Sequence, residues 1–101
     1  MKGGSGMFRV LKFGLEVTDF AVARMPEGAK ILSVAESGML EGVLQMWALV
    51  DPDAPMEDRR FRVVGTGHPF PDADECRFVG TVRTLRGFVW HVFEAEAGEA
   101  A

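Results

Sequence analysis

The sequence predicts an all-β protein, a small antiparallel β-sandwich or barrel of six or seven strands. Apolar and polar residues alternate with a period of two along most of the chain, as in half-buried strands. Glycine, proline and acidic turn residues interrupt this alternation at short intervals, and no convincing amphipathic helix is present. With 101 residues and 48% hydrophobic residues, the chain is long enough for one core and one domain.

The first strand is expected over residues 8–17. Alternate apolar side chains share one face of this segment, whereas Lys12 and Glu16 lie on the other. A short apolar run over residues 20–25 follows and ends at Pro26-Glu27-Gly28, which are typical turn residues.

Two further strands are expected before the middle of the chain. Residues 29–37 are rich in aliphatic and β-branched side chains and stop at a Ser-Gly pair. Residues 43–51 are apolar on both faces except at Gln45, which predicts a central strand that is covered on both sides.

The second half of the chain predicts three more strands. Residues 59–66 and 76–84 alternate, and a strict alternation places Phe78 and Val82 on the same face. A hairpin loop at residues 85–87 and a return strand over residues 88–94 complete the fold.

The ends of the chain are expected to lie outside the fold. Residues 1–6 are a flexible Gly/Ser leader, either a linker or a stretch upstream of the true start at Met7. Residues 7–95 form the single β domain, and residues 96–101 are a frayed acidic tail. The sequence has no apolar run of membrane-spanning length, no signal peptide and a single cysteine, so we expect a cytoplasmic protein.

The charge of the chain disfavours duplex nucleic acid as a partner. The net charge is −4 and the isoelectric point is about 5.1, so polyanions are repelled at long range. The charges are uneven, because six of the eleven basic residues are arginines between Arg59 and Arg86. Four acidic residues crowd the short stretch from Asp51 to Asp58.

The segment RRFRVVGTGHPF is the main candidate for an anion site. Gly65 and Gly67 allow successive backbone N–H groups to face one concavity, and His68 adds a donor. The arginine fork matches a phosphate group in geometry, and four arginines are expected on faces near this bend. They are Arg60, Arg62, Arg77 and Arg83. The alternative is an ordinary strand with solubilising charges, followed by an ordinary turn.

Trp47 is the remaining candidate ligand residue. Its strand is apolar on both faces, so the indole belongs either to the core or to a surface that faces a partner. An exposed indole beside cations would stack on a base or anchor a protein interface.

Several blocks of this sequence resemble a known family. They are MPEGAKILSV, WALVDPDAP, FRVVGTGHPF, FVGT and WHVFE, and the likeness extends from Met7 to Glu94. The chain is similar to short uncharacterised all-β proteins that are encoded by bacteriophages and prophages. The resemblance implies a phage origin and a compact β domain, and it carries no activity with it.

The sequence offers no catalytic or metal site. His91 lies within an apolar strand and is expected to have one ring nitrogen hydrogen-bonded, and Cys76 has no second cysteine nearby. The acidic stretch lacks the glycine and glutamate of a calcium-binding loop, and the chain has too few histidines and cysteines for zinc. We therefore expect no enzyme activity, no cofactor and no metal.

Two kinds of binding protein remain open. The first is a phage counter-defence protein that sequesters a small phosphorylated ligand, such as a nucleotide second messenger, in a pocket at the interface of a homo-oligomer. The second is an inhibitor that binds a host defence protein through an acidic and apolar face. A component of the virion is a further alternative.

Overall fold

The computed structural model describes residues 7–96. They form seven strands and one turn of 3-10 helix, η1 (Ala73–Glu75). The strands are β1 (Arg9–Glu16), β2 (Ala21–Pro26), β3 (Lys30–Glu36), β4 (Val43–Val50), β5 (Met56–Gly65), β6 (Cys76–Arg83) and β7 (Val89–Ala95). This confirms the expected number of strands.

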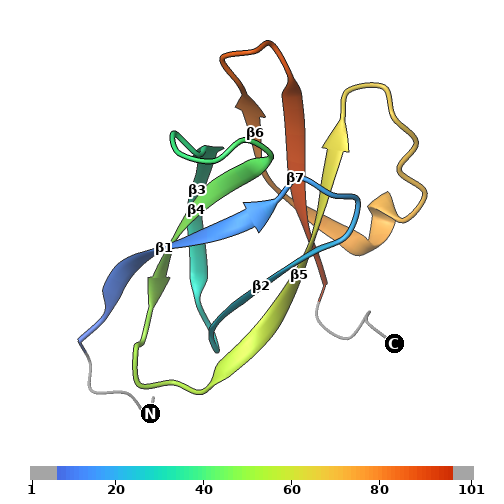
Figure 1. Cartoon of the computed structure of the whole chain (residues 1–101). Coiled ribbons are helices and arrows are strands. Elements are labelled where there is room, and N and C mark those ends of the chain that lie inside the picture. Colours follow the sequence, from blue (N-terminus) through green and yellow to red (C-terminus); the bar gives the residue numbers. More distant parts are fainter. Residues whose placement is uncertain (1–6, 97–101) are drawn as a thin grey trace.

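The strands form two antiparallel sheets that pack face to face (Figure 1). One sheet has three strands in the order β1-β4-β3, and the other has four in the order β2-β5-β7-β6. Strand β3 lies against β6 along one side of the sandwich, and β1 lies against β2 along the other. The sheets are not hydrogen-bonded to each other, so the fold is a sandwich and not a closed barrel.

The register of the three-stranded sheet follows from the alternation in the sequence. Leu15 pairs with Leu44 and Phe13 with Met46, and these residues face the four-stranded sheet. Lys12 pairs with Trp47 and therefore lies on the outer face. If the pairing of one strand shifted by one residue, its whole apolar row would face solvent. Burial of this row therefore fixes the register.

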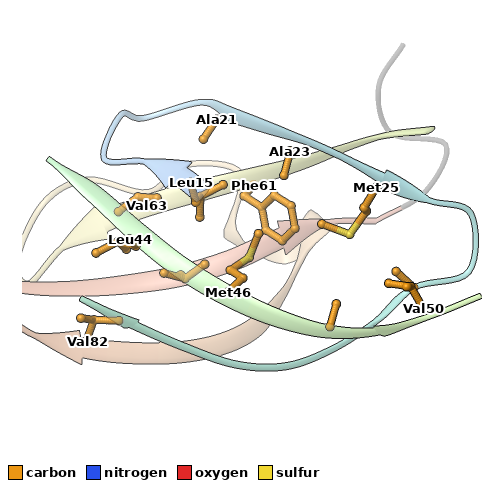
Figure 2. Close-up of a cluster of buried hydrophobic side chains, with 13 residues drawn as sticks. Leu15, Ala21, Ala23, Met25, Leu44, Met46, Val50, Phe61, Val63 and Val82 are labelled. Carbon is orange, nitrogen blue, oxygen red and sulfur yellow. The ribbon is translucent and has the colours of Figure 1, made fainter. Parts of the chain in front are cut away.

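The core lies between the two sheets (Figure 2). Phe61 stands at its centre, with Met25 from β2 and Met46 from β4 beside it (Figure 2). Small alanines on β2 and β4 lie between these large side chains, so the two layers approach closely. Each large apolar side chain contributes about 1.5–3 kcal/mol through its removal from water.

Strand β6 departs from the alternation that was expected for it. A register shift between Phe78 and Gly80 inserts one extra residue opposite β7. Phe78 pairs with Phe93 and is exposed, whereas Val82 is buried in the core. The prediction that these two residues share a face was wrong, because a bulge reverses the parity of every position after it.

Strand β5 begins earlier than expected. Residues 56–58 belong to this strand and not to the acidic connection, because they pair with residues 24–26 of β2. The side chains of Asp58 and Arg24 form an ion pair of 3.2 Å across the two strands. Opposite charges on neighbouring strands thus extend the sheet into a stretch whose composition indicates a loop.

Only one face of β4 is covered. The row Leu44, Met46, Ala48 and Val50 is fully buried, as expected of a central strand. The other row, which contains Trp47 and Leu49, is half-buried or exposed. Cover on both sides was therefore a wrong expectation for the single chain.

The predicted leader at residues 1–6 and most of the predicted tail, residues 97–101, lie outside the described residues. Glu96, the last described residue, donates its backbone N–H to the carbonyl of Glu75. Residues 7–96 contain no helix that is long and apolar enough to cross a membrane.

We predict that Gly80→Ala destabilises the protein by about 1–3 kcal/mol, the usual cost of overpacking. A Cβ atom at position 80 would lie 2.9 Å from the Val34 Cγ1 atom of the other sheet. Urea unfolding of the two proteins measures the difference. In the double variant with Val34→Ala, the new methyl group has room. The loss in free energy of unfolding should therefore be smaller than the sum of the losses in the two single variants, and an equal or larger loss would contradict this explanation.

Candidate functional site

The predicted glycine bend is filled by one of its own side chains. The imidazole of His68 lies over Gly65, where an added Cβ atom would be 3.0 Å from the ring. The backbone N–H of His68 donates to the Gly65 carbonyl at 3.1 Å, and Gly67 supplies the positive φ of the turn. The ring therefore occupies the concavity that the sequence suggested for an anion.

The side chain of Arg62 has a structural role, because its contacts are with other parts of the same chain. Its side chain is only 8% exposed and lies between the rings of Phe20 and Phe70, 4.2 and 5.0 Å from their centroids. Its Nε atom donates to the Asp19 carbonyl at 2.5 Å, and its Nη1 atom donates to the carboxylate of Asp72. This guanidinium fixes the β5–β6 loop on the outer face of the four-stranded sheet.

The other predicted ligand residues are spread over the molecule. Arg60 is exposed on β5, and Arg83 is exposed at the far end of β6, next to the β6–β7 loop. Trp47 belongs to the other sheet, and Arg77 binds Glu94 at 3.4 Å. Two of the predicted residues, Arg60 and Arg77, line one hollow.

That hollow is built around a buried ion pair. The Nη2 atom of Arg59 donates to the Glu94 carboxylate at 3.1 Å, its Nε atom donates to the other carboxylate oxygen, and Nη1 donates to the carbonyl of Ala29 at 2.9 Å. The hydrogen bond to Glu94 raises the pKa of Arg59 above its usual value. Glu57 is a further carboxylate at 3.6 Å. Arg59 and Arg77 already have a carboxylate partner, and acidic side chains outnumber basic ones in the lining, so the hollow has little capacity for an anion.

His91 is hydrogen-bonded on both sides of its ring. The Thr66 hydroxyl lies 2.7 Å from Nε2, and the Thr81 hydroxyl lies 3.0 Å from Nδ1. The sequence predicted one such bond. No carboxylate takes part in this arrangement, so it lacks the acidic member of a hydrolytic triad.

The apolar groove lies at one end of the sandwich. It is formed by the β3–β4 loop (residues 37–42), the β6–β7 loop (residues 84–88) and Trp90, and it has a volume of about 560 Å³. Figure 1 shows both loops at the end of the molecule that is remote from the loop between β4 and β5. The acidic stretch from Asp51 and this groove are therefore on opposite ends.

Large apolar side chains stand out into water around the apolar groove. Leu85 is 95% exposed and Met39 is 84% exposed, and Leu40 and Phe88 are also exposed. The Phe88 ring stacks on Trp90, with 5.9 Å between centroids. None of these loop side chains is needed for the core, and clustered exposed apolar residues mark interaction sites.

Polar contacts connect the β6–β7 loop to the end of β3 and to the β3–β4 loop. The backbone N–H of Leu85 donates to the Glu36 carboxylate at 3.0 Å, and Arg86 forms an ion pair with Glu41 at 3.0 Å. The rim therefore carries two carboxylates and one guanidinium. The groove combines apolar walls with a slightly acidic rim.

Residues 7–101 match the protein family described as Domain of unknown function (DUF7352). The chain belongs to this family. No match was found among curated proteins or among solved structures. Membership in DUF7352 agrees with the expected uncharacterised family, and it leaves the site to be argued from geometry.

The sequence contained a signal for the apolar groove that composition alone obscured. Loops are normally polar, yet SGML (37–40) and TLRGF (84–88) place large apolar residues beside glycines.

Within residues 7–96, no three histidine, cysteine or acidic side chains come together as a metal site.

We predict that Glu94→Gln destabilises the protein by about 3 kcal/mol, because it removes the charged partner that Arg59 binds through two hydrogen bonds in a largely buried site. Chemical denaturation measures the loss. Arg77→Gln is the matched control, since this partner of Glu94 is 63% exposed and its removal is expected to cost less than about 1 kcal/mol. Equal losses in the two variants would show that burial of the pair is unimportant.

The contact between Arg62 and Asp72 predicts a pH dependence. The hydrogen bond from Arg62 lowers the pKa of the Asp72 carboxyl, so its stabilisation is present above about pH 4 and is lost as the pH falls through the folded-state pKa. Asp72→Asn should therefore lower Tm at neutral pH, and the difference from the parent protein should shrink in acid. Asp74→Asn, at an exposed neighbouring position, serves as the control. A Tm difference that is constant with pH would contradict this role.

Proposed function

We propose that this chain is a non-enzymatic binding domain that docks on another protein through the apolar groove. The observation that supports it most directly is the set of apolar loop side chains held out in water at one end, with Leu85 and Met39 almost fully exposed. Trp90 and Phe88, which line the groove and stack on each other, provide the aromatic surface that interface hot spots favour.

The rim of the groove indicates the chemistry of the partner. Glu36 and Glu41 outnumber Arg86, and the whole chain carries a net charge of −4. A surface that presents an apolar side chain next to basic groups would be attracted at long range and would fill the groove on contact. We therefore propose a partner protein with an apolar and basic binding surface.

The biological setting that we propose is counter-defence by a bacteriophage. It rests on the resemblance of the sequence blocks to phage-encoded proteins, and a protein inhibitor is the version that fits the groove. Sequestration of a nucleotide has weaker support, because Arg62 and His68 are engaged within the fold and Arg83 lies away from the hollow that Arg60 and Arg77 line.

We predict that Leu85→Asp weakens capture of the partner from lysate of the bacterial host by about 30-fold, which is typical of a central interface residue. The side chain is almost fully exposed, so the fold should tolerate the change. Val22→Asp is the matched control, because Val22 is an exposed apolar residue on β2, outside the groove. Quantitative mass spectrometry of the bound fraction compares the three proteins.

Two results would contradict the proposal. One is a partner that binds the Leu85→Asp and parent proteins equally well. The other is calorimetric heat from a panel of cyclic and linear nucleotides together with no protein captured, which would favour the nucleotide alternative.

A further inference from the structure

The two sheets differ in how their outer faces are covered. The β5–β6 loop packs on the four-stranded sheet, where Phe70 contacts Phe93 with ring centroids 4.8 Å apart. Among residues 7–96, no loop covers the outer face of the three-stranded sheet in this way. Val10 and Leu49, which pair across this face, are 55% and 37% exposed. Strand β4 is apolar on both faces, and its outer face thus remains exposed to solvent.

This open face consists of a raised row next to a recessed row. The raised row crosses the sheet as Lys12, Trp47 and Ser33, with the indole at its centre. The adjacent row crosses as Gly14, Gln45 and Ala35, and its two flanking positions have almost no side chain. The indole therefore stands beside Gln45, and the positions on either side of Gln45 carry little or no side chain.

The flanking positions of the two rows fit each other by size, Lys12 over Gly14 and Ser33 over Ala35, which points to a second copy of the same chain. A two-fold axis that lies in the face, perpendicular to the strands and between the two rows, places Trp47 of each copy over the recessed row of the other. Residue 47 then faces residue 45 of the second copy, and residue 12 faces residue 14. Sheets that pack face to face in this way are about 10 Å apart with their side chains interlocked.

The charges on this face agree with the same two-fold axis. Lys12 would lie over Gly14 of the second copy, within reach of Glu16 two positions further along that strand. Neither Lys12 nor Glu16 forms an ion pair with any other residue in the described part of the chain. The axis creates this contact twice, and it brings no lysine opposite another lysine.

We propose that this chain forms a two-fold homodimer through the outer face of its three-stranded sheet, with Trp47 as the central anchor and reciprocal contacts between Lys12 and Glu16. The dimer leaves the loop side chains of each apolar groove free, because these lie at the end of the strands, and the groove adjoins the dimer face only at Val43. A dimer would therefore present two grooves to partner proteins. Since a three-stranded face is small, association is expected in roughly the micromolar range.

Charge exchange at positions 12 and 16 tests the dimer. Analytical ultracentrifugation of the full chain over about two decades of concentration gives the dissociation constant. Lys12→Glu and Glu16→Lys should each raise this constant by about tenfold, since attraction becomes repulsion at two symmetric contacts. The double variant should restore dimerisation, and an equimolar mixture of the two single variants should form a heterodimer.

Steric variants test the Trp47 anchor and the recessed position Gly14 separately. Gly14→Gln fills the recess, and the fold has room for it because an added Cβ atom meets only Val43 at 3.7 Å. This variant and Trp47→Ala should be monomers over the same range, with circular dichroism to verify folding. Arg83→Glu, on the other sheet, should dimerise like the parent protein.

Three results would overturn the proposal. The first is a parent protein that stays monomeric throughout the range. The second is a dimer that survives Gly14→Gln and Trp47→Ala, because it would use another face. The third is a pair of single charge variants that remain separate when mixed.

Discussion

The buried ion pair between Arg59 and Glu94 is the interaction on which the arrangement of the two sheets depends. It joins β5 to β7 within one sheet, and the same guanidinium reaches the Ala29 carbonyl at the turn that leads into β3 of the other sheet. An ion pair in a low-dielectric site is stabilising only when its remaining hydrogen-bonding groups are satisfied. No buried side-chain nitrogen or oxygen lacks a partner among residues 7–96, so this condition is met.

The arginine-rich segment therefore contributes mainly to the architecture. Arg59 lies on the inner side of β5, where it binds the Ala29 carbonyl, whereas Arg62 lies on the outer side between two phenylalanine rings. Alternation along one strand sends neighbouring arginines to opposite faces, where each meets its own set of acceptors. The sequence showed the density of these charges, but their partners come from residues 10 to 43 positions away.

The fold was predictable because a period of two is a local signal that repeats along the chain. Strands β1, β3, β4 and β7 lie where alternation and turn residues placed them. The bulge in β6 was not predictable, since Val79 looks like any other strand residue until its pairing with β7 is known. The candidate site depends even more on distant contacts. Leu85 and Met39 are 46 positions apart and meet only because two loops end at the same edge of the sandwich.

The hydrogen bond between the Glu36 carboxylate and the Leu85 backbone has a kinetic consequence. It ties the β6–β7 loop to the end of β3 before any partner arrives, so this loop loses little conformational entropy on association. An interface that needs no loop rearrangement forms at a rate limited mainly by diffusion and orientation. Differences in affinity among partners would then appear chiefly in how slowly each of them dissociates.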